Sequence, residues 1–374
     1  MPYLNPEIII DNDLNNAESS RNLLINITAE MWQDLMHHTH QEFANMGGIV
    51  NELAVDSAIS KISGGQDQDI KLLADTDFTK KDQVVVQQGK TVTLDAAGHQ
   101  VTFDNGSKNV LVSGTLVIED SNGEGLYTTQ TPYDSTHKSA IFACAEGGKI
   151  IMNSGDVEAV MADPVNEGQF AIICGQEGSS VEVNGGKVRA GWYAVSSNGT
   201  INDSTMTING GELISISDYA LYAPAKQGVV VINGGVIRGA AGAICANGGT
   251  ITINGGELSS LGNGDTGTWS DGTGGEGNSV IDLPAKYSAV TCTINGGIFL
   301  APEGTPVITK GANATVVIKG GVFSSDVSEF LGEGYQCVLN DEGLFEVVED
   351  TDDEVIDDSG ADPDHNAPVE NPEP

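Results

Sequence analysis

The chain has 374 residues, with 53 acidic and 16 basic side chains and a formal net charge of -37. This balance argues against nucleic acid and anionic membrane surfaces as partners, because their phosphates require Lys and Arg. It also argues against highly anionic glycans unless calcium bridges them. The five cysteines cannot all pair with one another, and buried free thiols are expected instead of a disulfide framework.

Residues 1–65 differ in texture from the rest of the chain. Residues 1–20 carry Ile8-Ile9-Ile10 among Asn and Asp, which is typical of an extended arm that orders on a partner. Residues 28–45 predict a helix with Thr28 as its N-cap, and residues 53–62 a second short one. The first helix has a stripe of apolar spacing, made by Trp32, Leu35, Met36, Thr39, Phe43 and Met46.

That stripe is too short to form a core alone, so it must pack on the first coil of the following domain or on copies of itself. We favour the second alternative and expect Trp32, Leu35, Met36 and Phe43 to anchor an oligomer, a homotrimer in this interpretation. His37, His38 and His40 lie on the same helix and can share a metal ion. No carboxylate or cysteine stands at a spacing that demands a metal, so no metal or cofactor is assigned.

A repeated motif dominates the middle of the chain. An apolar residue, then Asn or Lys, then Gly-Gly occurs six times, at 183–186, 208–211, 232–235, 253–256, 294–297 and 318–321. The intervals between the first glycines are 25, 24, 21, 41 and 24 residues. A fixed period of this size indicates stacked supersecondary units.

Each repeat predicts short strands. Ahead of each Gly-Gly, apolar residues alternate with mostly polar or β-branched ones, which is the period of a strand with one buried face. The apolar pairs are Val181/Val183, Met206/Ile208, Val230/Ile232, Ile251/Ile253, Cys292/Ile294 and Val316/Ile318. A second strand follows the glycines, and a third recurs as Ala, apolar, variable, small, for example at 140–143 and 220–223.

Three short strands per period without helical spacing predict an all-β fold, a right-handed parallel β-helix solenoid with a short α-helical N-terminal segment. The expected divisions are 1–65 for the arm and helical segment, 66–348 for the β-helix and 349–374 for a tail. The tail has 11 acidic residues among 26 and no Lys or Arg, so it is expected to be disordered.

Asparagine precedes five of the six glycine pairs. We expect Asn184, Asn209, Asn233, Asn254 and Asn295 to stack as a structural ladder in which each side-chain amide bonds its neighbours and satisfies buried polar groups. Residues 149–155 are a degenerate copy of the motif, with Ser154 in place of the first glycine. The long interval contains 262–277, rich in Gly, Asp and Thr, and predicts a loop extending from one coil.

The repeats offer no evident catalytic constellation. Glycan-cleaving enzymes need clustered carboxylates for acid–base chemistry or calcium, whereas the outward strand positions carry mostly Thr, Val and Ser. Arg189 and Arg238 share a repeat offset two coils apart, and Asp265 and Asp271 lie in the inserted loop. The chain is therefore interpreted as a non-enzyme, although a groove site assembled from distant coils stays an open alternative.

Three stretches resemble a known group of proteins. Residues 84–101 (VVVQQGKTVTLDAAGHQV), 114–121 and 320–335 resemble right-handed parallel β-helix proteins of the pectin-lyase-like superfamily, particularly those of gut bacteria and their phages. The resemblance covers about residues 69–348 and implies the fold. Neither the paired-Asp and Gly-His-Gly set of polygalacturonases nor the Arg-x-Pro-x-x-Arg of pectate lyases is present.

Cell-envelope relatives usually carry a signal peptide and an anchor, and residues 1–13 show neither a basic leader nor an apolar core. No 18-residue apolar run occurs. We therefore expect a structural virion component, a phage head or tail fibre or decoration protein. Residues 1–65 would attach to capsid or tail proteins, and the β-helix would project outward to contact host-surface glycans. The alternatives are a bacterial glycan-binding adhesin and, less favoured, a polysaccharide lyase or hydrolase.

Overall fold

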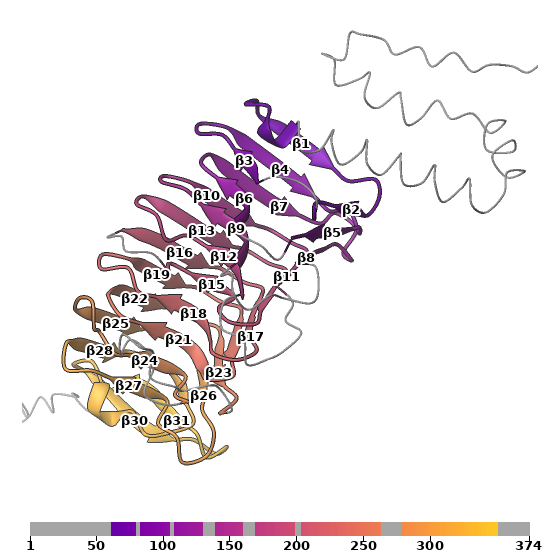
Figure 1. Cartoon of the computed structure of the whole chain (residues 1–374). Helices are drawn as coiled ribbons and strands as arrows, with labels where there is room; N and C mark the ends of the chain where they lie inside the picture. Colours follow the sequence, from indigo (N-terminus) through magenta and orange to yellow (C-terminus); the bar gives the residue numbers. More distant parts are fainter. Residues whose placement is uncertain are drawn as a thin grey trace, which may run out of the picture. The chain divides into compact units, whose positions relative to one another are not determined.

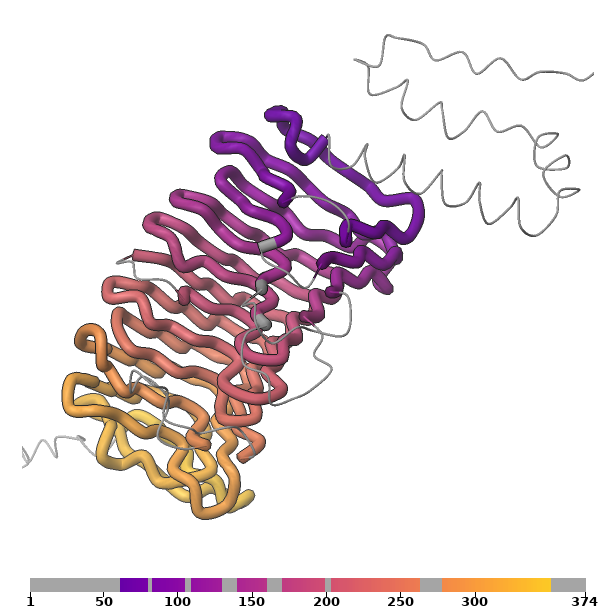
Figure 2. Tube along the Cα trace, viewed as in Figure 1, coloured from indigo at the N-terminus to yellow at the C-terminus, as the bar shows by residue number. Residues whose placement is uncertain are grey.

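The computed structural model describes residues 61–79, 83–104, 108–129, 139–159, 169–198, 203–262 and 278–350. The chain divides into two compact units, Met1–Ser57 and Ala58–Pro374, and the described residues belong to the second. They form three long sheets in which neighbouring strands come from successive coils (Figure 1). Figure 2 follows the backbone through these coils one after another. The all-β, parallel β-helix fold expected from the repeat is confirmed. The expected helix at 28–45 lies outside the described residues.

Sheet A contains the strand that precedes each glycine pair. All of its ladders are parallel. Its strands, in spatial order, are β1 (Gln68–Lys71), β4 (Thr91–Asp95), β7 (Thr115–Glu119), β10 (Lys149–Met152), β13 (Ser179–Val183), β16 (Ser204–Ile208), β19 (Val229–Ile232), β22 (Gly249–Ile253), β25 (Val290–Ile294) and β28 (Ala314–Ile318).

Sheet B contains the strand that follows the glycines. Its strands, in spatial order, are β2 (Thr76–Asp77), β5 (Gln100–Phe103), β8 (Leu126–Thr129), β11 (Asp156–Ala159), β14 (Lys187–Ala190), β17 (Glu212–Ser215), β20 (Val236–Gly239), β23 (Glu257–Ser260), β26 (Ile298–Leu300), β29 (Gly321–Phe323), β31 (Phe345–Glu349) and β30 (Tyr335–Leu339). The last two strands pair antiparallel, whereas the others are parallel.

Sheet C contains the third strand of each coil. Its strands are β3 (Val84–Val86), β6 (Lys108–Val112), β9 (Ser139–Cys144), β12 (Gln169–Ile173), β15 (Val195–Ser196), β18 (Tyr219–Ala223), β21 (Gly242–Ala246), β24 (Ile281–Leu283) and β27 (Ile308–Lys310). Six internal segments lie outside the described residues. Five of them connect a strand of sheet B to the next strand of sheet C: 80–82, 105–107, 130–138, 160–168 and 263–277. The sixth, 199–202, connects sheet C to sheet A.

The core is a set of columns, because the register places equivalent residues of successive coils directly over one another. From β4 to β28 one column of sheet A is at most 1 % exposed, and it consists of Leu94, Ile118, Met152, Val183, Ile208, Ile232, Ile253, Ile294 and Ile318. Burying one such side chain stabilises the fold by about 1.5–3 kcal/mol relative to exposing it. The continuous dry column makes each coil depend on its neighbours.

The second glycine of each pair makes the corner between sheets A and B. Gly211 has φ +81°, a conformation that side chains with a Cβ adopt at a cost. A Cβ on Gly211 would lie 2.7 Å from the carbonyl oxygen of Gly186 in the preceding coil. Glycine is therefore required there by backbone conformation and by close approach of the coils.

The C-terminal end of the solenoid is closed by a structure that the repeat pattern does not predict. After β29 the chain forms a short 3-10 helix, η1 (Ser328–Phe330), in which Phe330 is buried. Gly332 then donates its N–H to the Ile318 carbonyl of the last sheet A strand, at 2.7 Å. The hairpin of β30 and β31 completes sheet B. An open solenoid needs such caps because its end coils expose core positions.

Candidate functional site

The outer face of sheet A carries two columns of small, mostly β-branched side chains. The first column is Thr91, Thr115, Lys149, Ser180, Thr205, Val229, Thr250, Thr291 and Thr315. The second is Thr93, Val117, Ile151, Glu182, Thr207, Val231, Thr252, Thr293 and Val317. The charged members of these columns, Lys149 and Glu182, lie on neighbouring strands.

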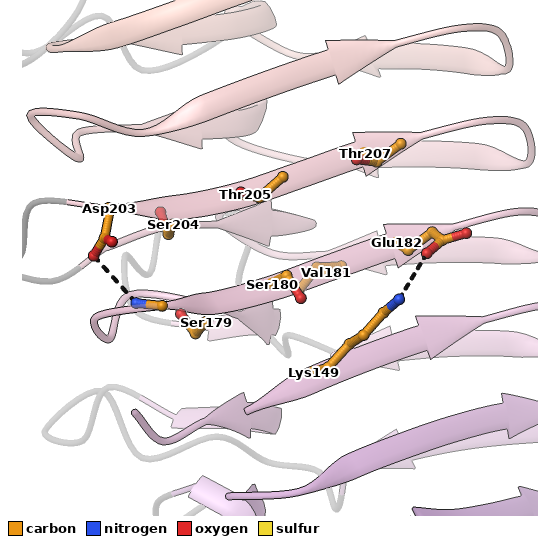
Figure 3. Close-up of a pocket in the computed structure, with 10 residues that line it drawn as sticks. Lys149, Ser179, Ser180, Val181, Glu182, Asp203, Ser204, Thr205 and Thr207 are labelled. Carbon is orange, nitrogen blue, oxygen red and sulfur yellow. Dashed lines mark hydrogen bonds and ion pairs between the residues drawn. The ribbon is translucent and has the colours of Figure 1, made fainter. Parts of the chain in front are cut away.

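A hollow of about 370 Å³ lies at those strands. Its lining is polar and comes from β10, β13 and β16 and from the turns before the last two: Lys149, Gly178, Ser179, Ser180, Val181, Glu182, Asp203, Ser204, Thr205 and Thr207. Figure 3 shows the side chain of Lys149 extending from β10 toward Glu182 on β13. This is an exposed surface depression of a size that suits a small ligand.

Two polar contacts organise the hollow. Lys149 Nζ lies 3.1 Å from Glu182 Oε2, with side chains 41 % and 32 % exposed. At the other end, Asp203 Oδ1 accepts a hydrogen bond from the Gly178 N–H at 3.1 Å (Figure 3). An exposed ion pair contributes only about 0–1 kcal/mol to stability. A ligand can therefore separate Lys149 from Glu182 and bind to either side chain.

The chemistry of this lining matches a neutral ligand rich in hydroxyl groups. The hydroxyls of Ser180, Thr205 and Thr207 can both donate and accept hydrogen bonds. Lys149 and Glu182 offset each other's charge, and Asp203 is the third charged side chain of the lining. Glu182 pairs with Lys149, and Asp203 accepts the Gly178 N–H. Both carboxylates keep further acceptor positions for the hydroxyl groups of such a ligand.

A second polar cluster lies on sheet C and is buried. Its aromatic rings stack within and between coils: Trp192 lies on its sequence neighbour Tyr193 with centroids 4.5 Å apart, and Tyr193 lies on Tyr222 of the next coil at 4.6 Å. Phe170 packs on Trp192 at 5.0 Å. These four side chains are at most 7 % exposed. Stacked rings of this kind contribute about 0.5–1.5 kcal/mol per pair beyond their burial.

Two buried carboxylates flank these rings. Asp218 Oδ2 accepts a hydrogen bond from Trp192 Nε1 at 2.8 Å, and its Oδ1 accepts one from the Tyr219 N–H at 2.7 Å. Asp282 Oδ2 accepts the Tyr219 hydroxyl at 3.1 Å, and Oδ1 accepts Thr309 Oγ1 at 2.8 Å. Burial, and then the charge of Asp282, raise the pKa of Tyr219 well above its ordinary value. The hydroxyl therefore stays a donor, and the cluster holds successive coils together.

This cluster was not predicted from the sequence. Its residues occupy the third-strand register as Trp192-Tyr193 and Tyr219 to Tyr222, but sequence spacing does not show that Asp218 and Asp282, on different coils, approach the same tyrosine. The only hint in the sequence was that aromatic residues occupy equivalent positions of successive repeats. The hydrogen bond from Tyr219 to Asp282 could not be predicted, because it depends on how the coils stack.

The asparagines of the repeat form one hydrogen-bonded column. Each side-chain Nδ2 donates to the Oδ1 of the preceding coil: Asn209 to Asn184 at 2.8 Å, Asn233 to Asn209 at 2.7 Å, Asn254 to Asn233 at 2.8 Å and Asn295 to Asn254 at 2.8 Å. Asn184 donates in turn to Asn153, from the degenerate repeat, at 2.9 Å. The prediction that these amides are buried was wrong. The asparagines directly follow the strands of sheet A, and their side chains are exposed there.

The two repeated arginines lie on sheet B and have acidic partners. Arg189 forms an ion pair with Glu158 of the preceding coil, and Arg238 pairs with Glu212. Lys187 Nζ also lies 3.8 Å from Glu212. These half-exposed pairs link neighbouring coils, and they leave no guanidinium directed at a ligand.

Several residues considered from the sequence lie outside the described part of the chain. These are the anchoring residues Trp32, Leu35, Met36 and Phe43, the histidines 37, 38 and 40, and the loop carboxylates 265 and 271. Within the described ranges, no three His, Cys, Asp or Glu side chains gather in a way that could hold a metal ion. Among the same residues, no helix has the length and apolar character to cross a membrane.

Comparison with known proteins adds no relative: no family model, curated protein or solved structure matches the chain.

Proposed function

We propose that the protein is a non-catalytic structural component of a phage particle, a fibre or decoration subunit whose residues 1–65 attach to capsid or tail proteins. The β-helix projects outward, and the hollow on sheet A contacts neutral glycans of the host surface. The observation that supports this most is the combination of a continuous dry column with a polar hollow on the outer face of sheet A.

Rigidity is the physical reason for the structural role. In sheet A the buried column runs from Leu94 to Ile318 without a polar residue, and the coils are further tied by the asparagine column and by ion pairs on sheet B. Bending this unit would open dry contacts between coils, so it keeps its form outside a cell. A glycan contact suits the hollow because hydroxyls line it and the charges of Lys149 and Glu182 are paired.

The attachment role rests on the apolar stripe of residues 28–45. Sedimentation equilibrium of the full chain is expected to give the mass of a homotrimer. This trimer is expected to bind the phage particle of which the protein is a component. Replacing Trp32 and Phe43 by Glu should abolish trimer formation and particle binding, because both charges would enter the apolar stripe that is proposed to form the trimer contact. Gln33→Glu, on the polar side of the helix that the sequence predicts, is the matched control and should change neither. A monomeric wild-type chain would rule out the proposal, and glycan binding by such a monomer would favour the adhesin.

The glycan contact is tested separately. The probe is an array of neutral oligosaccharides released from the surface polysaccharides of gut bacteria. A double variant, Thr205→Val and Thr207→Val, removes two hydroxyls from the hollow without changing side-chain shape, and should weaken binding at least about tenfold, or 1.4 kcal/mol. Thr291→Val with Thr293→Val makes the same change outside the hollow and should bind like the wild type. Equal affinities for the two double variants would show that the hollow is not the glycan site.

A further inference from the structure

Among the described residues, the last strand of sheet B has no neighbouring strand on its outer side. β30, with the sequence Tyr-Gln-Cys-Val-Leu, is the final strand in the spatial order and pairs on one side with β31. Native proteins usually blunt such edges with Lys, Pro, a bulge or a very short strand. The strand of Tyr335–Leu339 has five residues and none of these features. By contrast, β1 at the opposite end carries Asp69 and Lys71.

The hydrogen-bond pattern shows which backbone groups face away from the sheet. The Asp350 N–H donates to the Gly334 carbonyl at 2.8 Å, and the Asn340 N–H donates to the Leu344 carbonyl at 2.8 Å. In an antiparallel ladder, hydrogen-bonded pairs recur at every second residue. With the register Gln336 to Val348 and Val338 to Glu346, the even-numbered residues of β30 bond to β31. The N–H and C=O groups of Cys337 and Leu339 therefore point outward.

The side chains of this edge continue a column of the core. Leu339 is in register with Phe345, and Phe345 with Phe323, whose ring stacks on Phe299 at 4.7 Å. Phe299 and Phe323 are fully buried, but Leu339 is 66 % exposed because no coil follows it. One more strand beside β30 would cover part of the exposed Leu339 side chain, and of Cys337, which is now half-buried.

The charge around the edge selects the partner. No Lys or Arg follows Lys319 in the sequence, and residues 326–350 contain eight Asp and Glu. The following residues 351–374 contain nine more. A second copy of this chain would bring the same negative charge to the edge and be repelled. A segment flanked by Lys or Arg would be attracted instead.

We infer that the free edge of β30 binds an extended segment of another protein as an additional strand of sheet B. The segment has apolar residues at alternate positions, which cover Leu339 and Cys337, and Lys or Arg on both flanks. Main-chain hydrogen bonds to Cys337 and Leu339 supply the affinity, as in other cases of strand addition. This surface is independent of the glycan hollow and of residues 1–65.

The probe is a fluorescent peptide of about ten residues, the upper length of ordinary strands, in which Thr and Val alternate between pairs of lysines. Binding to the full chain is followed by fluorescence anisotropy. Cys337→Pro removes an outward N–H that β31 does not use, and Pro is tolerated on edge strands. It should weaken binding at least about tenfold, whereas Cys337→Ala, which keeps the N–H, should bind like the wild type. A peptide with glutamates in place of lysines should not bind.

Hydrogen exchange of individual backbone amides in the wild-type chain gives a second test, which does not depend on whether a variant folds. The peptide should slow exchange at Cys337 and Leu339 and leave Gln336 and Val338, already bonded to β31, unchanged. Equal binding by Cys337→Pro and Cys337→Ala, or binding without this protection, would overturn the inference and indicate attraction to the negative charge alone. Self-association of the wild type that Cys337→Pro abolishes would assign the edge to a second copy and would also overturn it.

Discussion

Asn153 donates its Nδ2–H to Glu119 Oε1 at 2.9 Å, so the asparagine column of sheet A ends on a carboxylate. Every amide in the column points its N–H toward the N-terminal end, because each donates to the coil before it. The aligned amides present a positive end to Glu119, where a negative charge is stabilising. Hydrogen bonds to a charged acceptor are about twice as strong as neutral ones, so this contact fixes the direction of the whole column.

The column should contribute measurably to stability. Asn209→Ala removes two side-chain hydrogen bonds, to Asn184 and from Asn233, and Asn295→Ala removes the single bond to Asn254. We expect Asn209→Ala to lower the free energy of unfolding by about 1–2 kcal/mol and Asn295→Ala by about half as much. Urea unfolding followed by far-UV circular dichroism measures both. Equal losses would contradict a role for the continuous column.

The corner glycines should resist substitution for two separable reasons. Gly235 has φ +91°, and a Cβ there would lie 2.8 Å from the Gly211 carbonyl oxygen. Gly304 has a similar φ of +78° but nothing within 4 Å of the added atom. Left-handed backbone costs a non-glycine residue about 1–2 kcal/mol, so Gly304→Ala measures conformation alone. Gly235→Ala should destabilise the protein more, and similar unfolding midpoints for the two variants would be inconsistent with close contact between coils.

The cysteines should differ sharply in reactivity. Burial raises the pKa of the Cys144 and Cys292 thiols to about 12, and also raises those of Cys174 and Cys245. Thiolates are the reactive form, so these four should not react at neutral pH. Cys337 is partly exposed. Intact-mass measurement after treatment with a maleimide should therefore show one adduct on the native protein and five after unfolding, and none on native Cys337→Ala.

The N-terminal coils should lose stability in acid through Asp95. Partial burial opposes its charge, but hydrogen bonds from Ser121 and Ala97 together with the charge of Lys71 hold the pKa of Asp95 below its ordinary value of 3.8. A carboxyl group with a lowered pKa stabilises the fold above its ordinary pKa and loses that contribution as pH falls through the folded value. The urea concentration at the midpoint of unfolding should therefore decrease as the pH is lowered from about 4 to about 2.

Asp95→Asn is the control for this acid effect. The amide keeps an acceptor for the Ser121 N–H, bonded at 2.8 Å in the wild type, but it cannot titrate. The variant should be less stable at neutral pH and should show a smaller loss between the same two pH values. An unchanged pH dependence in Asp95→Asn would place the acid sensitivity at other carboxyl groups.

The regular part of the fold could be predicted because its determinants are local. Val181 and Val183, and the glycines 185 and 186, recur with a nearly constant period, so each coil specifies its own strands and corner. Stacking identical coils then places like residues over like. The degenerate copy at 149–155, which reads Asn-Ser-Gly, was recognised from the sequence, but Asn153 was not included in the expected column; the structure adds it through its bond from Asn184.

The hairpin of β30 and β31 could not be predicted in this way. The sequence from Tyr335 to Glu349 resembles further strands, and only the structure shows that they turn back antiparallel and close sheet B. The choice depends on Phe330 and Val347 covering the last coil, which are contacts between distant segments. The aromatic and acidic cluster on sheet C likewise depends on Tyr219 reaching Asp282, 63 residues away.

The amino-acid sequence by itself determined the three-strand coil, its glycine corner and the aliphatic interior, because period-two alternation and left-handed glycines act within a few residues. Tertiary structure decided which polar groups meet: the hollow between Lys149 and Asp203, the carboxylates beside Tyr219 and the open edge at Leu339. These depend on register between coils and on where stacking stops, and hydrophobic periodicity fixes only which side of each strand is buried.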